Sequence, residues 1–242
     1  MKIFSKTDVG LVRLCNQDAM TSGSFEDGTA WAVVCDGMGG ANGGEVASSE
    51  AIDVISRRIN ESYRSDMTSS AIRTMLESAV LEASFRIFDI SRADTSLSGM
   101  GTTVVIAIVC ADKLYTAHAG DSRAYILGKD GARQITTDHS IVQEMVELGQ
   151  ITADEAKHHP RRNIITRALG VNGFVEVDFG GCEYRDGDIV LLCTDGLSNL
   201  VEPEELLSLA LETELENLPE RYIEAACEKG GNDNITAVVM SR

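Results

Sequence analysis

Apolar residues recur every three or four positions along two early stretches of the chain, residues 44–60 and 69–90. This spacing places the apolar side chains on one face of a helix, so it predicts two amphipathic helices. The stripes consist of Ala47, Ala51, Ile55 and Ile59 in the first stretch and of Ile72, Leu76, Ala79, Ala83 and Ile87 in the second. Residues 203–211 and 219–229 each open with a proline, which the first turn of a helix tolerates. They predict two further helices.

Short β-rich segments fill much of the second half of the chain, at residues 102–109, 113–119, 123–127 and 133–136. Only a few residues separate them, whereas a parallel crossover needs about a dozen or more, so we expect antiparallel neighbours. Lys129-Asp130-Gly131 suits a hairpin turn. Residues 188–194 and 235–241 are typical of buried strands. Helices and strands do not alternate regularly, which favours an α+β fold over a doubly wound parallel sheet.

The composition is that of a globular protein, and the 242 residues contain no repeat and no Pro- or Ser-rich linker. We therefore expect one domain over residues 1–242. The start of the chain lacks a signal-peptide pattern, and no apolar run approaches the ~18–20 residues that span a bilayer. The six cysteines form no CxxC pair, which favours reduced thiols and a cytoplasmic location. A net charge of −17 argues against nucleic acid and against anionic membranes as partners.

Three apolar segments run directly into acidic turns. Residues 31–35 lead to Asp36-Gly37, residues 114–119 to Gly120-Asp121, and residues 189–194 to Asp195-Gly196, while Asp233 precedes the last strand. A single Asp-Gly pair is more often a simple turn than a ligand. Several carboxylates at the ends of buried strands are costly unless a cation pairs with them. Oxygen ligands without a His or Cys cluster suit Mg²⁺ or Mn²⁺ rather than zinc.

Arg13 is the candidate for binding an anion. It precedes Asp18 by five residues in the segment Arg13-Leu14-Cys15-Asn16-Gln17-Asp18. A guanidinium offers a fork of donors that matches two phosphate oxygens. Taken alone, an arginine before a turn is more often a surface residue. The interpretation of Arg13 as an anion ligand therefore depends on the aspartates elsewhere in the chain.

The remaining motifs are Asp8-Val9-Gly10, Asn16-Gln17-Asp18, Gly44-Glu45-Val46-Ala47-Ser48, Met100-Gly101-Thr102-Thr103, Gly120-Asp121-Ser122-Arg123, Asp138-His139-Ser140, Thr166-Arg167-Ala168-Leu169-Gly170, Thr194-Asp195-Gly196-Leu197 and Asn232-Asp233-Asn234-Ile235-Thr236. With Arg13 and residues 36–40, this series resembles the metal-dependent protein phosphatases of the protein phosphatase 2C type, in their short bacterial form. The resemblance covers essentially the whole chain and keeps the family order. Any one of these motifs would be weak, but their ordered succession is specific.

The resemblance implies a fold and a metal site. In that family two antiparallel β-sheets pack as a central sandwich with helices on both outer faces, and a dinuclear metal site lies at one end. It implies that Asp36 bridges two ions of Mn²⁺ or Mg²⁺ and that Asp195 and Asp233 complete the first site. Asp36, the backbone carbonyl of Gly37 and, through water, Asp18 would hold the second ion.

Further roles come from the same resemblance. Asp121 with Asp195 matches a third, weaker metal site, and Arg13 matches the phosphate-binding arginine. Catalysis would rest on Arg13, Asp36 and Asp195. Two cations lower the pKa of a bridging water, so that hydroxide exists near neutral pH and attacks phosphorus in line. The expected activity is metal-dependent hydrolysis of phosphoserine and phosphothreonine in proteins, including Ser/Thr kinases and their targets, by a monomeric enzyme.

Four positions call for separate comment. Met38 replaces a histidine that some eukaryotic relatives use as general acid, and Gln17 replaces a glutamate that many relatives use as a ligand. Bacterial members share both features, so neither marks an inactive enzyme. Cys35, beside Asp36, is expected to pack in a strand, and His139 is expected to fix a turn.

Residues 141–168 are polar, amphipathic and rich in loops. They correspond to the family's flap beside the active site, although an ordinary helical hairpin remains an alternative. Two other functions stay open at this point. One is a scaffold that binds phosphoproteins without turnover, which would have lost metal ligands. The other is a phosphatase dedicated to one regulatory switch, which would usually carry sensor or membrane segments.

Overall fold

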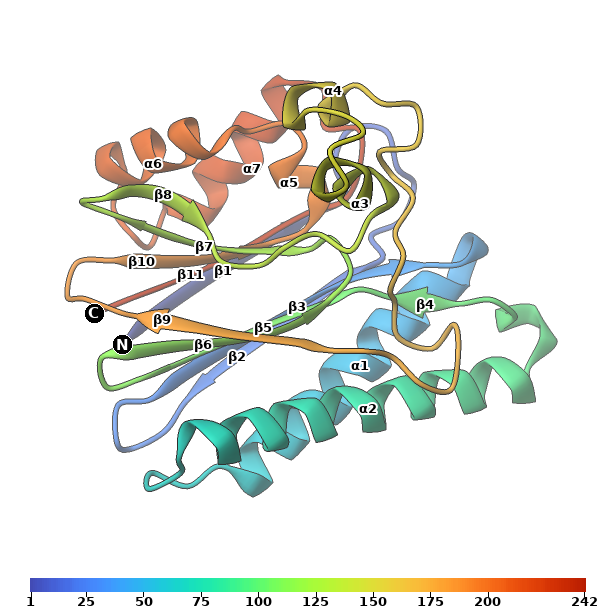
Figure 1. The fold of residues 1–242 in the computed structure, drawn as a ribbon, viewed down its shortest axis with the longest axis horizontal. Coiled ribbons are helices and arrows are strands. Elements are labelled where there is room, and N and C mark those ends of the chain that lie inside the picture. Colours follow the sequence, from blue (N-terminus) through green and yellow to red (C-terminus); the bar gives the residue numbers. More distant parts are fainter.

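The computed structural model describes residues 1–242, apart from the side chains of Ala41 and Asn42. Two β-sheets pack face to face, α1 and α2 cover the outer face of one, and α6 and α7 cover the outer face of the other (Figure 1). All strand pairs are antiparallel. The expected α+β sandwich with helices on both outer faces is confirmed.

Each sheet combines strands from distant parts of the chain. The first has the order β1-β11-β10-β7-β8, and the second has the order β2-β3-β5-β6-β9, with β4 paired to the end of β3. The strands are β1 (Lys2–Asp8), β2 (Asp18–Ser24), β3 (Ala30–Met38), β4 (Gly101–Thr102), β5 (Val104–Cys110), β6 (Lys113–Ala119), β7 (Arg123–Gly128), β8 (Gly131–Gln134), β9 (Asp178–Glu183), β10 (Ile189–Cys193) and β11 (Ile235–Ser241).

The four predicted helices are present with bounds shifted by a few residues. No helix among the described residues is both long and apolar enough to cross a membrane. The helices are α1 (Gly40–Ser62), α2 (Ser69–Ala93), the 3₁₀ turn η1 (Thr95–Leu97), α3 (Ile141–Glu147), α4 (Ala153–Lys157), α5 (Asp195–Ser198), α6 (Pro203–Glu212) and α7 (Leu218–Glu228).

Strand β3 is buried on both faces, because it lies between a helical layer and the opposite sheet. Trp31, Val33 and Cys35 pack toward the cluster formed with α1 and α2. Ala32 and Val34 pack into the cluster between the two sheets. Successive side chains of a strand point to opposite faces, so a continuous apolar run is what a strand in this position requires. The same burial confirms that Cys35 packs within a strand.

Asp36 and Asp195 differ locally from the prediction that acidic turns follow the strands. Asp36 lies inside β3, two residues before its end, and Asp195 is the first residue of α5. Asp121 does follow β6 directly. Both differences hold the carboxylates in regular structure, where their backbone is fixed more firmly than in a loop.

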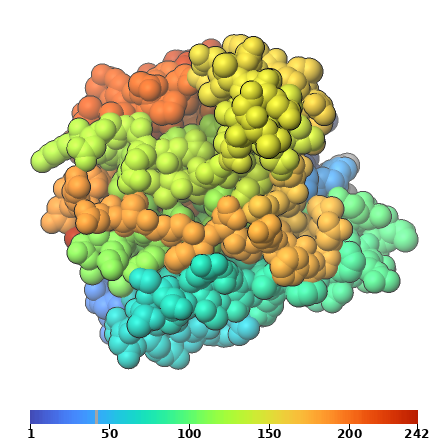
Figure 2. All heavy atoms as spheres, in the orientation of Figure 1, coloured from blue at the N-terminus to red at the C-terminus, as the bar shows by residue number. Residues whose placement is uncertain are grey.

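Residues 141–168 form a separate raised layer, which appears in yellow on the upper right of Figure 2. They contain α3 and α4, and the two ends of the segment meet at an isolated bridge between Ser140 and Ile165. Lys157 at the end of α4 donates to Glu202 before α6, at 3.0 and 3.1 Å. This ion pair ties the flap to the helical layer of the first sheet.

Gly37 allows β3 to approach α1 and the loop before β2. A Cβ at this position would lie 2.0 Å from the carbonyl oxygen of Gly44 and 2.6 Å from that of Gln17. Both neighbours are backbone atoms, so neither can move aside cheaply. Any larger residue would push β3 away from α1.

We expect Gly37→Ala to lower the free energy of unfolding by about 1–3 kcal/mol, as overpacking does. For a chain of this size the melting temperature would fall by roughly 3–10 °C. Gly173→Ala is the matched control, since a Cβ there would meet its nearest neighbour at an ordinary 3.5 Å. Thermal denaturation followed by circular dichroism makes the comparison. Equal melting temperatures of the two variants would contradict the argument.

Candidate active site

Two aspartates face each other across neighbouring strands. In the β2–β3 pair the register places Asp18 directly opposite Asp36. Side chains at opposed positions lie on the same face, and like charges there are destabilising. The backbone of Asp36 is fixed in addition, because its carbonyl oxygen accepts from the backbone N–H of Thr103 at 2.9 Å and from the Thr102 hydroxyl at 2.8 Å. The opposed carboxylates therefore cannot separate without breaking the sheet.

Three more aspartates approach this pair from other elements. Asp121 follows β6, Asp195 begins α5 after β10, and Asp233 immediately precedes Asn234 and β11. The pKa of Asp36 is raised well above its usual value, first by burial and then by repulsion from Asp18, Asp195, Asp121 and Asp233. The metal ligands proposed from the sequence thus gather into one acidic cluster at one end of the sandwich.

Asp18 is supported on one oxygen only. Its Oδ2 accepts hydrogen bonds from the hydroxyls of Thr194 at 2.9 Å and Thr236 at 2.7 Å. Its Oδ1 is buried without a hydrogen-bond partner in the part of the chain that the structure describes. Burial raises the pKa of Asp18 to about 7, although the two hydroxyls oppose the change. The bare oxygen has the character of an acceptor that lacks its cation.

Asp195 shows the same asymmetry. Its Oδ2 accepts from the side-chain amide of Asn199 at 3.0 Å, while its buried Oδ1 has no partner within the described residues. Burial, and then repulsion from Asp233, raises its pKa. Burial also raises the pKa of Asp121 to about 7, and repulsion from Asp195 adds to the rise. Asp195 is thus close enough to both Asp36 and Asp121 to raise the pKa of each.

Arg13 lies on the exposed rim of the cluster. Its Nη2 donates to Oδ2 of Asp233 at 2.7 Å, and about half of its side chain is exposed. The hydrogen bond and the charge of Asp233 raise the pKa of the guanidinium further. Arg13 therefore reaches the acidic cluster while it keeps donors open to solvent, as an anion-binding residue must.

Asn234 binds the Arg13 loop to the cluster. Its Nδ2 donates to the carbonyl oxygens of Val9 and Cys15, each at 3.0 Å, and its Oδ1 accepts from the backbone N–H of Gln17 at 2.8 Å. The motif around Asp233 indicates a ligand at that aspartate, but it assigns no role to Asn234. The only signal was its place beside an aspartate in an Asn-Asp-Asn run.

A partly buried ion pair supports the strand after Asp121. Arg123 donates through Nε and Nη2 to both carboxylate oxygens of Asp138, at 2.9 and 2.6 Å. The neighbouring His139 accepts at Nδ1 from the backbone N–H of Gly120, at 3.1 Å. Its own backbone N–H donates to the carbonyl oxygen of Gly120. The prediction that His139 fixes a turn is confirmed, and that turn leads into Asp121.

A second group of possible metal ligands consists of His118, His139 and Asp178. His139 and Asp178 make several protein contacts, while Nδ1 of the buried His118 has no hydrogen-bond partner among the described residues. A backbone N–H can only donate, so Nδ1 of His139 must be unprotonated, and its Nε2–H points to Asp178 at 3.2 Å. Arg167 also donates to Asp178, at 2.7 Å. Burial lowers the pKa of both histidines. The hydrogen bonds of His139 and Asp178 indicate a structural network.

The carboxylate cluster, by contrast, fits divalent cations. Its donors are hard oxygens, two of them buried and without hydrogen-bond partners among the described residues, and such sets suit Mg²⁺ or Mn²⁺. Thiols do not compete, because burial raises the pKa of Cys35 and Cys193. Gln17 turns away from the cluster and donates through Nε2 to the carbonyl oxygen of Gly40 at 3.0 Å.

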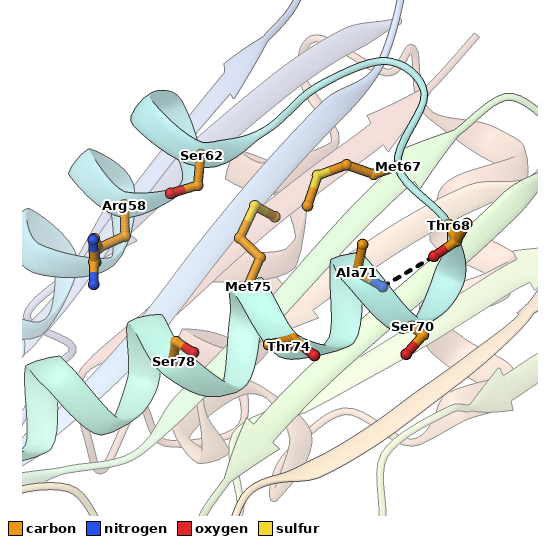
Figure 3. Close-up of a pocket in the computed structure, with 9 residues that line it drawn as sticks. All are labelled: Arg58, Ser62, Met67, Thr68, Ser70, Ala71, Thr74, Met75 and Ser78. Atoms are coloured by element: carbon orange, nitrogen blue, oxygen red, sulfur yellow. Dashed lines mark hydrogen bonds between the residues drawn. The ribbon is translucent and has the colours of Figure 1, made fainter.

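Two cavities differ in their relation to the cluster. A cleft of about 620 Å³ is lined by Asp121 and Asp195 together with residues of the flap and of the start of α6. A groove of about 560 Å³ lies between the last turns of α1 and the first turns of α2 (Figure 3). Its lining contains no carboxylate. The length of α1, at ~1.5 Å per residue, separates that groove from the aspartates.

A family model for protein phosphatase 2C matches residues 12–236. The chain belongs to this family. It is 39% identical to the serine/threonine phosphatase Stp of Listeria innocua, over 98% of this chain and 94% of that protein. This chain is therefore a metal-dependent protein serine/threonine phosphatase of the short bacterial form.

Solved structures agree with this assignment. The serine/threonine phosphatase of S. agalactiae superposes with a TM-score of 0.91 at 31% identity, over all of this chain and 99% of that one. The catalytic domain of the phosphatase PstP, in complex with two manganese ions, superposes with a TM-score of 0.85 at 35% identity, over 98% and 96% of the two chains. The fold and the activity that the sequence predicted are both confirmed.

The raised carboxyl pKa values predict an unusual pH dependence in metal-free protein. Between about pH 4 and 7 the folded state holds protons on Asp121 that the unfolded state has released, so ionisation on raising the pH lowers the stability. We expect the melting temperature of Asp121→Asn in EDTA, measured relative to wild type, to rise by roughly 3–10 °C between pH 5 and pH 8, a relative gain of about 1–3 kcal/mol.

Asp130→Asn is the matched control for this comparison, since Asp130 lies exposed in the turn between β7 and β8. Differential scanning fluorimetry across pH 5–8 measures each melting temperature relative to wild type. A gain for Asp121→Asn that is equal at both ends of the range would contradict the assignment of a raised pKa.

Proposed function

We propose that residues 1–242 act as one catalytic domain in which Mn²⁺ or Mg²⁺ is held by Asp18, Asp36, Asp121, Asp195 and Asp233 and by the backbone carbonyl of Gly37. The observation that carries this assignment is a pair of buried oxygens that have no hydrogen-bond partner among the residues described, Oδ1 of Asp18 and Oδ1 of Asp195. Both belong to carboxylates whose pKa is raised chiefly by burial. A cation at this place would compensate the cost of burying them.

The residues divide the work by position. Asp36, whose pKa is raised by the charges of all four other aspartates, would be the bridging ligand. Asp195 and Asp233 would complete the first metal site, and Asp18 would support the second ion. Asp121 together with Asp195 would hold a third, more weakly bound ion. Bound cations supply positive charge that draws in phosphate oxygens and makes a water acidic enough to be deprotonated near neutral pH.

Arg13 and the two central aspartates act on the substrate. Arg13 can turn its guanidinium from Asp233 toward two oxygens of a phosphate monoester, which it matches as a bidentate donor. Asp36 and Asp195, whose charges repel each other within the cluster, would orient the attacking water. Met38 offers no proton to the leaving serine or threonine oxygen, so that proton comes from water.

The proposed setting is bacterial signalling in the cytoplasm. The substrates would be phosphoproteins, including Ser/Thr kinases and their targets, and the enzyme would work as a monomer. What supports this is the likeness to Stp of Listeria innocua along 94% of that protein together with the acidic character of the chain. The flap, tied to the core through Lys157 and Glu202, would shape access to the cleft beside Asp121.

Hydrolysis of p-nitrophenyl phosphate tests the metal-ligand assignment. We expect wild type to require Mn²⁺ and to lose activity in EDTA, because a cation must balance the buried carboxylates. Asp36→Asn and Asp195→Asn should lower kcat/KM by at least about 100-fold, whereas Asp130→Asn should match wild type. Activity that persists in EDTA, or in either active-site variant, would overturn the assignment. Calorimetric titration of Mn²⁺ distinguishes a phosphatase from a scaffold that binds no metal.

Arg13→Lys tests the phosphate-binding role. Lysine keeps the positive charge but not the planar fork, so we expect KM for a phosphothreonine peptide to rise about tenfold with a smaller change in kcat. Arg86→Lys serves as the control, because Arg86 pairs with Glu50 on the outer helices. An unchanged KM would remove Arg13 from the binding site.

A further inference from the structure

The loop between β1 and β2, residues 9–17, exposes an apolar surface around Arg13. Leu11 is 68% exposed, Val12 61% and Leu14 fully exposed. Exposed apolar side chains that occur singly are ordinary, whereas a group of them marks a contact surface. Here three large apolar side chains occur within four consecutive positions, and the remaining position is Arg13, the proposed phosphate ligand.

This exposure does not come from a loose loop. Gly10 adopts a left-handed conformation with φ of 76°, and its N–H donates to Oδ1 of Asp8 at 2.8 Å. The backbone N–H of Leu11 donates to the carbonyl oxygen of Gly231 at 2.8 Å. Asn234 holds both ends of the loop, as described above. The backbone is therefore fixed, and the apolar side chains are presented to solvent in a defined arrangement.

The loop is also continuous with the active site. Nη2 of Arg13 lies 2.7 Å from Oδ2 of Asp233, so the side chains on either side of Arg13 flank the place where a phosphate would bind. Consecutive residues of a bound peptide are ~3.3–3.8 Å apart. The residues next to a phosphoserine or phosphothreonine must then pass within reach of Leu11, Val12 or Leu14.

We propose that the apolar loop of Leu11, Val12 and Leu14 contacts apolar side chains adjacent to the phosphorylated residue of a protein substrate. This rests on the proposed role of Arg13 in binding phosphate. The occupant is a peptide segment and not a lipid surface, since a chain with a net charge of −17 is repelled by an anionic bilayer. The loop thus selects among phosphoproteins by the residues that flank the phosphate, through burial of apolar area.

Two phosphothreonine peptides test the proposal, one with leucine on both sides of the phosphothreonine and one with serine at both places. We expect wild type with Mn²⁺ to favour the leucine peptide about fivefold in kcat/KM, a difference of ~1 kcal/mol. The variant Leu11→Ser/Leu14→Ser should lose this preference. Leu211→Ser, at a site 79% exposed on α6, should keep it. The rate on p-nitrophenyl phosphate, which has no flanking residue, normalises each variant.

Each result separates the loop's role from the proposed function. If wild type and Leu11→Ser/Leu14→Ser hydrolyse the aryl phosphate but show the same peptide preference, the proposal for the loop is wrong and the phosphatase assignment stands. If wild type hydrolyses neither peptides nor aryl phosphate with Mn²⁺, both fail. Co-sedimentation of wild type, but not the double variant, with phosphatidylglycerol vesicles would reassign the loop to a membrane. A concentration-dependent dimer in analytical ultracentrifugation, lost in the double variant, would reassign it to a second copy of the chain.

Discussion

The structure depends on the forced proximity of like charges at one end of a sandwich whose interior is otherwise apolar. Register alone places Asp18 opposite Asp36, and strand and helix ends bring further carboxylates beside them. The cost appears as raised pKa values and as buried oxygens that lack hydrogen-bond donors in the described chain. The two sheets and their helical layers supply the free energy that holds the carboxylates together. A divalent cation that binds these carboxylates relieves their repulsion, and the free energy recovered in this way strengthens cation binding.

The elements that could be predicted are those whose own sequence specifies their environment. The two long helices show a clear helical stripe, and β5 is almost wholly apolar because both its faces are buried. Strands β1, β2 and β9 could not be predicted in this way. β2 reads Asp-Ala-Met-Thr-Ser-Gly-Ser, and its register with β3 is what makes it a strand. β9 contains two glycines and depends equally on its pairing with β6.

The candidate site divides in a similar way. The aspartates and Arg13 could be predicted, since charged residues at the ends of apolar segments stand out and follow a family order. Their supporting partners could not, because hydroxyls and amides are common anywhere in a chain. Thr194, which follows β10, and Thr236, which lies in β11, meet at one oxygen of Asp18. Only the pairing of β10 with β11 brings them together.

Asn234 shows how metal binding and substrate recognition are mechanically connected. Its neighbour Asp233 belongs to the acidic cluster, while its own side chain closes the loop that carries Arg13. Any shift of the segment at Asp233 therefore moves the loop, and any shift of the loop moves Asp233. Because Arg13 pairs with Asp233, the residue that we propose to bind phosphate also neutralises a proposed metal ligand. In that proposal, one short segment before β11 sets the relative position of cation, phosphate and the apolar side chains that flank Arg13.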